Sequence, residues 1–318
     1  MATDHDRHLR LQQPRFTLDE VARQASVDPR VARRIFRAIG MAERRADEAF
    51  LDEQDVAGLR AFHDLLELGT PMEEMIALSR AYGYAMSRIA DAEAGVFRTY
   101  FVQPMVEGGL SQTELEERLE RVGEMTLRLT DVLLHNTRRV HLAAALREVT
   151  AEAARGGAQR LAVAFVDLVD FSVASAELDR AALSAMISTF EDIAISACVD
   201  AGAHLVKVLG DGAMAVSAQP PRAFQAAEIM VRVAADEEGF PDARAGLDFG
   251  DVVSLGGDYF GTPVNRASRI TAATAAGTIA MSAEFKAALG DGVATRELGR
   301  RALKGVGEVT LFAVADPA

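Results

Sequence analysis

Two short apolar runs in the second half of the chain each end in an aspartate, and this pattern constrains the fold most. Asp167 follows the β-rich run that begins at Leu161, and Asp211 follows the run His204–Leu209 and precedes Gly212. A buried strand that ends in a carboxylate must pair that charge, because an unpaired buried charge is costly. A lone aspartate in such a place is usually a turn residue or a helix cap. Two of them predict a site for two divalent ions, Mg²⁺ or Mn²⁺, of the kind used for displacement at phosphorus.

A third segment, Asp258–Arg269, favours the metal-site interpretation. An aspartate precedes a glycine turn at Gly261, and a helix is predicted from Pro263. Asn265 and Arg269 are four residues apart, so they lie on one face of this helix. An amide and a guanidinium one turn apart can both contact one pentavalent phosphorus.

With these three segments in this order, the second half of the chain resembles the class III adenylyl and guanylyl cyclases. A fourth motif, Leu303–Gly307, follows near the end, so the resemblance covers about residues 157–318. Four motifs in order are specific, whereas any one of them would be weak. The resemblance implies an enzyme that cyclises ATP to 3′,5′-cyclic AMP and releases pyrophosphate, through attack of the 3′ hydroxyl on the α-phosphate.

The resemblance also implies a role for each motif residue. Asp167 and Asp211 match the two metal-binding aspartates, while Lys207 and Asp258 match the pair that reads the base. An ammonium can donate to adenine N1 and a carboxylate can accept from the 6-amino group, whereas guanine presents the opposite pattern at both places. This pair therefore favours ATP over GTP.

Three further matches concern the ribose and the phosphates. Asn265 would orient the ribose, Arg269 would stabilise charge that develops at the α-phosphate, and Lys304 would bind the terminal phosphates. In this family the site lies between two catalytic domains, which contribute the metal aspartates and the other residues respectively. A chain whose single catalytic domain carries every role therefore implies a homodimer with two sites.

One position departs from the family pattern. Asp170 stands three residues after Asp167, where the family usually has glycine. Glycine lets the backbone approach the triphosphate, whereas Asp170 adds a side chain and a negative charge beside an anionic substrate. This departure leaves open a second interpretation, a catalytically silent cyclase-like domain that senses a nucleotide as a dimer.

The second half alternates strand and helix patterns in a βαββαβ order. This order predicts an α+β, ferredoxin-like domain with an antiparallel sheet that carries helices on one face. The predicted elements are a strand at Leu161–Val166, a helix at Asp179–Asp200, a hairpin of His204–Leu209 and Ala213–Ala218, a helix at Pro221–Ala235, a strand region at Ala243–Leu255, a helix at 263–274, and strands at Thr278–Ser282 and Val309–Val314.

The first half contains helical patterns throughout. They predict an all-α regulatory domain (1–110) and a long linker helix (111–156) before the catalytic domain (157–318). A helix of about 40 residues spans about 60 Å, and we expect it to bend at Asn136–Thr137, which interrupt its apolar seam. The apolar, methionine-rich stretch 72–105 predicts either a bundle core or a site for an apolar ligand.

Two features of the first half suggest further functions. His135 and His141 flank the expected bend, so protonation near about pH 6–7 would bias it, unless both are simply solvated histidines. Residues 16–40 form a helix-turn-helix-like pattern in which Asp28 caps a second, arginine-rich helix that begins with Pro29. A DNA-binding regulator is therefore a third interpretation, although a solvated basic face has the same pattern and the net charge of −13 argues against nucleic acid.

Composition indicates the compartment. The single cysteine, Cys198, excludes an internal disulfide and fits a reducing cytoplasm. No apolar run reaches about 18 residues, so we expect no membrane-spanning helix. The segment Met1–Gln13 is polar and charged, unlike a signal peptide. The expected partners are ATP, divalent ions and a second copy of the chain in the cytoplasm.

Overall fold

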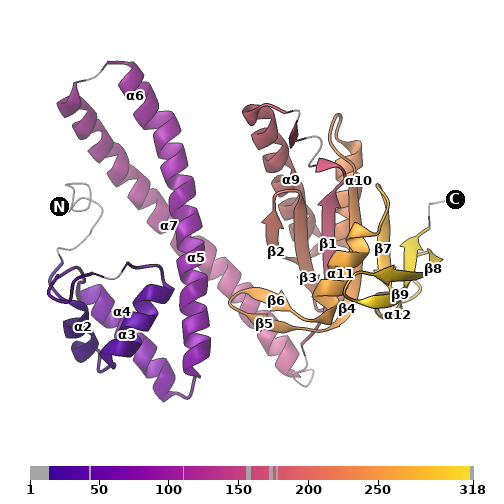
Figure 1. Cartoon of the computed structure of the whole chain (residues 1–318), viewed down its shortest axis with the longest axis horizontal. Helices are drawn as coiled ribbons and strands as arrows, with labels where there is room; N and C mark the ends of the chain where they lie inside the picture. The colour runs from indigo at the N-terminus through magenta and orange to yellow at the C-terminus, as the bar shows by residue number, and fades with distance from the viewer. Residues whose placement is uncertain are drawn as a thin grey trace. The chain divides into compact units, whose positions relative to one another are not determined.

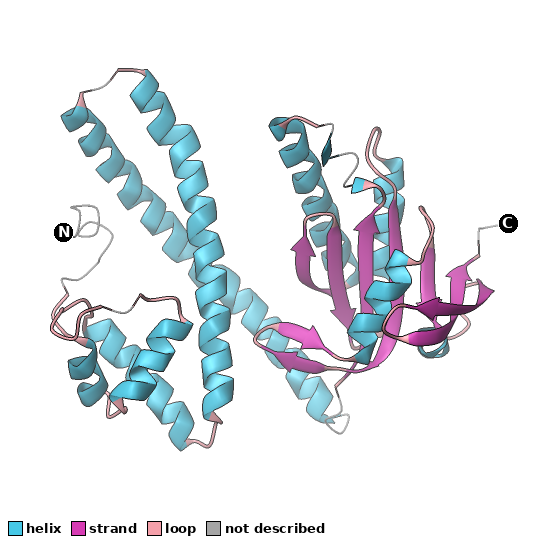
Figure 2. Ribbon diagram, viewed as in Figure 1, coloured by secondary structure: helices cyan, strands magenta, loops and turns pink. Residues whose placement is uncertain are grey.

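The computed structural model describes most of the chain, coloured by position in Figure 1 and by secondary structure in Figure 2. The described residues are 14–42, 44–109, 111–154, 159–171, 175–176 and 178–315. Met1–Gln13 and the glycine pair Gly156–Gly157, where we expected a domain boundary, lie outside them. The chain divides into two units, Met1–Thr150 and Ala151–Ala318.

The first unit is built from helices. They are α2 (Leu18–Gln24), α3 (Pro29–Ala38), α4 (Glu53–Glu67), α5 (Met72–Phe97), the π-helix η1 (Arg98–Val102), α6 (Gln103–Glu107) and α7 (Gln112–Ala154). The predicted start of α3 is confirmed. The carboxylate of Asp28 accepts a hydrogen bond from the amide of Arg30 at 2.7 Å, and Pro29 occupies the first turn.

Two arginines of α3 are paired with acidic residues of neighbouring helices. Arg33 donates to Asp19 of α2 at 2.7 Å, and Arg34 donates to Glu73 of α5 at 2.7 Å. Each ion pair uses Nη2 of the guanidinium and links α3 to a neighbouring helix. The basic face of α3 therefore has a structural role within the first unit.

The helices α5 and α7 form an antiparallel pair that is closed at one end by η1 and α6 (Figure 1). Thr130 of α7 donates to Glu93 of α5 at 2.7 Å. Near its start α5 buries Met75 and Ile76, whereas Tyr82 and other large side chains further along the helix are exposed. The stretch 72–105 is therefore a bundle core only at its beginning.

The long helix α7 is continuous over 43 residues. The helix does not unwind at Asn136–Thr137, where we expected its seam to be interrupted, because it runs through both residues. Asn and Thr lower helix propensity by only about 0.5 kcal/mol each, which a long helix tolerates. Large apolar side chains remain exposed along it, namely Met125, Leu129, Val132, Leu133, Val140, Leu142, Leu146 and Val149.

The second unit is built on a seven-stranded sheet of order β2-β3-β1-β4-β7-β9-β8, with a separate β5-β6 hairpin. The strands are β1 (Arg160–Leu168), β2 (His204–Leu209), β3 (Gly212–Ser217), β4 (Ala243–Asp251), β5 (Val253–Leu255), β6 (Asp258–Phe260), β7 (Ile279–Ser282), β8 (Thr295–Leu303) and β9 (Gly307–Val314). The predicted antiparallel sheet is wrong at one pair, since β4 and β7 are parallel. A helical crossover joins these two strands and returns the chain in the same direction.

Helices cover both faces of this sheet, so the expectation of helices on one face is wrong. The helices are α9 (Arg180–Ala201), α10 (Pro220–Asp236), α11 (Thr262–Ala272) and α12 (Ala283–Leu289). Along β1, Ala164 and Val166 join the cluster formed by α9 and α10, whereas Leu161 and Val163 cluster with Ala267 of α11. Because successive side chains of a strand point to opposite faces, the continuous apolar run of β1 requires cover on both.

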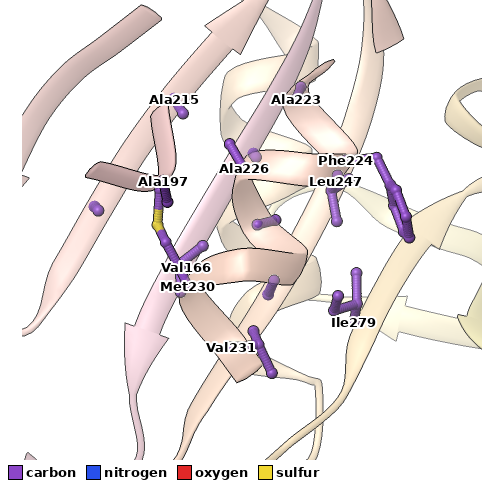
Figure 3. Packing of buried hydrophobic residues seen from close by; sticks show 14 of the residues in the cluster. Val166, Ala197, Ala215, Ala223, Phe224, Ala226, Met230, Val231, Leu247 and Ile279 are labelled. Carbon is purple, nitrogen blue, oxygen red and sulfur yellow. The ribbon is translucent and has the colours of Figure 1, made fainter. Parts of the chain in front are cut away.

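The larger core lies between the sheet and the helices α9 and α10. Figure 3 shows Ala226 and Met230 of α10 close to Val166 and Leu247 of the sheet. Contrary to the sequence expectation, α9 is long and apolar enough to cross a membrane by length and composition alone, with a mean hydropathy of 1.4. One face of α9, which includes Phe190, is buried in this core, and 28% of the apolar window is buried.

On the other face, α11 lies directly against β4 at Gly246. A Cβ atom at this position would lie 2.2 Å from the amide nitrogen of Thr271 and 2.5 Å from the carbonyl oxygen of Ala267. Glycine therefore sets the distance between α11 and the sheet. Since α11 carries Asn265 and Arg269, its position determines theirs.

Candidate active site

The two aspartates expected to bind metal lie at the same end of neighbouring strands. Asp167 of β1 is in register with Gly212 of β3, and Asp211 lies in the turn that precedes Gly212. The amide of Leu168 donates to the carbonyl oxygen of Asp211 at 2.9 Å. Oδ1 of Asp167 points towards this turn, since it would lie 3.7 Å from a Cβ atom on Gly212. The sheet thus brings the two segments together.

The chemistry of these donors fits a hard divalent ion. Carboxylate oxygens are ligands that Mg²⁺ and Mn²⁺ accept readily. Within the part of the chain that the structure describes, no group of three or more His, Cys, Asp or Glu side chains is arranged to hold a metal. The other ligands of an ion held by Asp167 and Asp211 would be oxygens of the substrate, of water or of the backbone.

Arg244 is a site residue that the sequence analysis missed. It is the cross-strand partner of Asp167 on β4. Its guanidinium donates to Oδ2 of Asp167 from Nη2 at 2.9 Å and from Nε at 3.3 Å, and it reaches the carbonyl oxygen of Thr274 at 3.4 Å. No local motif marks this arginine, because the pairing depends on the register of two strands.

The structure also joins the two residues expected to read the base. The ammonium of Lys207 on β2 donates to Oδ2 of Asp258 at the start of β6. Oδ1 of Asp258 accepts from the amide of Tyr259 at 2.8 Å, which holds the carboxylate in place. The side chains of the pair are 29% and 33% exposed, so a ligand can reach both.

Asn265 and Arg269 are both exposed on the same side of α11. The helix begins after Gly261, whose φ of 141° suits glycine, and the amide of Asn265 donates to the carbonyl oxygen of Gly261 at 3.2 Å. Neither side chain hydrogen-bonds or pairs with another residue of the described ranges. Their donors are therefore available to a ligand.

Lys304 lies far from the base-reading pair but near α11, because its neighbour Leu303 is in one buried cluster with Ile270, the residue that follows Arg269. It is exposed in the turn between β8 and β9, and β8 is at the opposite edge of the sheet from β2, which carries Lys207. Figure 1 shows these strands on opposite sides of the unit. The structure does not bring Lys304 together with the base-reading pair.

Asp170, the departure from the family pattern, adopts a backbone conformation that glycine prefers. Its φ is 55°, in the left-handed region. Aspartate is among the few other residues that tolerate this region. The substitution therefore keeps the turn that glycine would make, while it adds an exposed carboxylate.

Comparison with known proteins identifies the family. No protein-family model matches the chain. An adenylate cyclase of Streptomyces coelicolor is 32% identical over 259 residues, which are 81% of this chain and 67% of that protein. A pH-sensitive adenylate cyclase of Mycobacterium tuberculosis is 26% identical over 314 residues, or 93% of this chain and 77% of that protein.

A solved structure is similar over part of the chain. The adenylyl cyclase CyaB from P. aeruginosa matches 50% of this chain and 95% of its own, with 24% identity and a TM-score of 0.45. The chain itself spans about two thirds of the Streptomyces enzyme. The identity to the Streptomyces enzyme shows the family, and the four motifs occur in the order that this family has. The chain therefore belongs to the class III adenylate cyclases.

Proposed function

We propose that the second unit converts ATP to 3′,5′-cyclic AMP and pyrophosphate in the cytoplasm. A bond forms between the ribose 3′ oxygen and the α-phosphorus, the bond from the α-phosphorus to the bridging oxygen of the β-phosphate breaks, and the proton of the 3′ hydroxyl passes to water. The observation that carries the proposal is the Lys207–Asp258 ion pair, whose donor and acceptor complement adenine. Membership of the adenylate cyclases supports the same substrate.

Lys207 and Asp258 would select the base. An ammonium has three N–H donors, so Lys207 can donate to N1 of adenine while it stays bonded to Asp258. The carboxylate can accept a further bond from the 6-amino group. Guanine would place its N1–H against the ammonium and its O6 against the carboxylate, and both contacts would be repulsive.

Asp167 and Asp211 would hold two Mg²⁺ or Mn²⁺ ions. When bound, such ions would lower the pKa of the 3′ hydroxyl and neutralise the triphosphate. Asn265 would orient the ribose, and Arg269 would donate to the α-phosphate as negative charge develops there. Lys304 would bind the terminal phosphates.

We further propose that two copies of the chain form the active enzyme, with Asp167 and Asp211 of one copy facing the base-reading pair and α11 of the other. The exposed apolar residues of α7 support a second copy. Met125, Leu129 and Val132 have the four-then-three spacing of a coiled-coil seam. Sedimentation should show a dimer that Leu129→Glu converts to a monomer, whereas Arg128→Glu, one residue away, should stay dimeric.

The first half would regulate this activity, with residues 1–110 as an inhibitory domain and residues 111–156 as the linker. A groove of about 630 Å³ lies between α5 and α7. Its α5 side includes Tyr82 and Met86, and its α7 side includes His135. An apolar ligand would fit the first side, and protonation of His135 would add charge to the second. The similarity to a pH-sensitive relative supports this proposal.

The groove can be tested with a fluorescent apolar probe and a pH series. Anilinonaphthalene sulfonate should bind the full chain, and Met86→Lys should weaken that binding. Cyclic AMP production should change between about pH 5.5 and 8, and His135→Gln should flatten the profile. A profile that His135→Gln leaves unchanged would contradict a role of this histidine.

The decisive experiment for the enzyme is cyclic AMP production from ATP by the full chain with Mg²⁺ or Mn²⁺. Asp211→Ala should reduce the rate by at least about 100-fold, because the metal site is lost. Asp200→Ala, which removes an exposed carboxylate of α9, should leave it unchanged. Full activity in Asp211→Ala would contradict the metal role, and ATP binding without turnover in the wild type would favour the silent-sensor interpretation.

A further inference from the structure

Arg266 of α11 is the centre of a polar network that no sequence motif accounts for. Its guanidinium binds the carboxylate of Asp248 on β4 in a two-point contact, through Nε to Oδ2 and through Nη2 to Oδ1 at 2.8 Å. Its third nitrogen, Nη1, donates to Glu284 at the start of α12 at 3.0 Å. One side chain therefore links α11 to two other elements of the unit.

Asp248 accepts four hydrogen bonds, one on Oδ2 and three on Oδ1. Oδ1 also accepts from the hydroxyl of Ser282 and, at 2.8 Å, from the amide of Phe249. The hydroxyl of Ser282 in turn accepts from the amide of Phe285 at 3.0 Å, as the N-cap of α12. Burial raises the pKa of Asp248, and the bonds from Arg266 and Ser282 offset part of that rise.

Stability alone is a poor explanation for this network. The side chain of Asp248 is 0% exposed and that of Arg266 is 15% exposed. Removing both charges from water costs about as much as their attraction returns, so a buried ion pair adds little net stability over apolar residues of similar size. Such a pair does fix the orientation of the two side chains relative to each other, because a planar guanidinium binds a carboxylate through two parallel hydrogen bonds.

The orientation that the Arg266–Asp248 pair imposes is relevant because of the position of Arg266 in α11. It follows Asn265 directly and precedes Arg269 by three residues. At about 100° per residue, Asn265 and Arg269 point about 40° apart, and Arg266 lies about 60° beyond Arg269. The contact at Gly246 sets how near the helix lies to the sheet. The hydroxyl of Thr271 also reaches the carbonyl oxygen of Phe165 on β1 at 3.3 Å, but it lies closer to the carbonyl oxygen of Ala267 in its own helix, at 2.9 Å. Arg266 therefore makes the stronger polar contact between α11 and the rest of the unit.

We propose that Arg266, held by Asp248, is a positioning residue for the cyclisation: it sets the rotation of α11 and so the point that Asn265 and Arg269 reach. The inference rests on the proposed roles of Asn265 and Arg269 at the ribose and the α-phosphate. Arg266 acts through these two residues and does not contact the substrate.

Two variants test this role in the full chain. Arg266→Lys keeps the charge and loses the two-point contact, and Asp248→Asn keeps the shape and loses the carboxylate. We expect kcat to fall by about 10- to 100-fold in each, because displacements of about 1 Å have such effects. KM for ATP should change less than about threefold, since Lys207 and Asp258 lie outside α11. The matched control is Arg300→Lys, whose partner Glu308 is 3.5 Å away on an exposed part of the sheet.

Two readouts separate positioning from a loss of folded protein. The first is the ratio of kcat for ATP to kcat for its α-phosphorothioate analogue, which does not depend on the active fraction. A displaced guanidinium of Arg269 should change this ratio at least about threefold, whereas Arg300→Lys should leave the ratio unchanged. The second is a double-mutant cycle. If Arg266 acts through Arg269, the effect of Arg266→Lys should largely disappear in an Arg269→Lys background.

The opposite results would overturn the inference. One such result is a lower kcat in the Arg266 and Asp248 variants while the ratio of kcat for ATP to kcat for the phosphorothioate analogue is unchanged and the effects of Arg266→Lys and Arg269→Lys are additive. That result would show that the network only stabilises the unit. Wild-type kcat in both Arg266→Lys and Asp248→Asn would show that α11 needs no such link. If the wild type and Arg300→Lys both fail to make cyclic AMP, the proposed function itself fails, which is a different result from loss in the Arg266 and Asp248 variants alone.

Discussion

Nη2 of Arg244 lies 2.9 Å from Oδ2 of Asp167, so a carboxylate proposed to hold a divalent ion is already bonded to a cation. The two residues face each other across β1 and β4, and their side chains are 25% and 30% exposed. A metal ion at Asp167 would share this carboxylate with the guanidinium or displace it. Arg244 would therefore oppose metal binding at Asp167 by like charge and by competition for one oxygen.

Removing that charge should strengthen metal binding. We expect Arg244→Gln to lower the Mg²⁺ concentration for half-maximal activity by up to about fivefold, equivalent to about 1 kcal/mol for a partly exposed pair. The measurement is cyclic AMP production across a Mg²⁺ titration. Arg160→Gln is the matched control, because Arg160 faces Asp251 at the other end of the same strand pair. A higher Mg²⁺ requirement in Arg244→Gln would show instead that the arginine orients Asp167 for the metal.

Variants of Asp170 can separate the effect of its negative charge from the effect of its backbone conformation. Its φ of 55° favours glycine, and asparagine tolerates it, whereas a β-branched residue does not. Asp170→Gly and Asp170→Asn should both lower KM for ATP, because each removes a negative charge near the triphosphate. Asp170→Val removes the same charge but should destabilise the turn by about 1–2 kcal/mol.

Steady-state kinetics and thermal unfolding of the three variants would measure both effects. An unchanged KM in Asp170→Asn would show that the exposed carboxylate does not sense the substrate. A lower KM in Asp170→Gly alone would indicate that backbone approach, and not charge, is what the aspartate limits.

Gly246 should not accept even one methyl group. In Gly246→Ala the new Cβ would lie 2.2 Å from a backbone nitrogen of α11, so the helix must move away from β4. We expect a loss of about 1–3 kcal/mol in the free energy of unfolding, together with a lower kcat. Denaturant unfolding and cyclic AMP assays measure these effects. Gly292→Ala is the control, because no atom lies within 4 Å of its Cβ position.

Cys198 should be unreactive in the folded protein. It is 2% exposed, and burial raises the pKa of its thiol from 9.0 to about 12. Thiol reagents attack the thiolate, so we expect modification at pH 8 to be at least about 100-fold slower than in the unfolded chain. A disulfide reagent followed by absorbance, with and without guanidinium chloride, measures the two rates. Fast modification of the native protein would contradict the burial of Cys198.

The raised pKa of Cys198 also predicts how the free energy of unfolding depends on pH in the alkaline range. Because the folded-state pKa is raised, the neutral thiol stabilises the fold fully below pH 9.0, and this contribution is lost as the pH rises from 9.0 to about 12. Unfolding of Cys198→Ala across this range should show a smaller alkaline loss than the wild type. Equal losses would assign the effect to other groups.

Local patterns in the sequence were sufficient for several features. The 3.6-residue period predicts α7 and places Asn265 and Arg269 on one face of α11, and both features are seen in the structure. Asp28 and Pro29 mark the start of α3 because capping depends on neighbouring residues alone. The order of four short motifs was enough to identify the family, which sequence comparison confirms.

Only the tertiary structure decided the contacts between segments that are distant in the chain. The partner of Asp167 is Arg244, 77 residues later, and the partner of Arg266 is Asp248, 18 residues earlier. These pairs depend on strand register and on the packing of α11 at Gly246, which no local period encodes. The parallel pairing of β4 and β7 and the helices on both faces depend on the path of the chain in space. Periodicity reports which face of an element is apolar, whereas tertiary packing determines what lies against it.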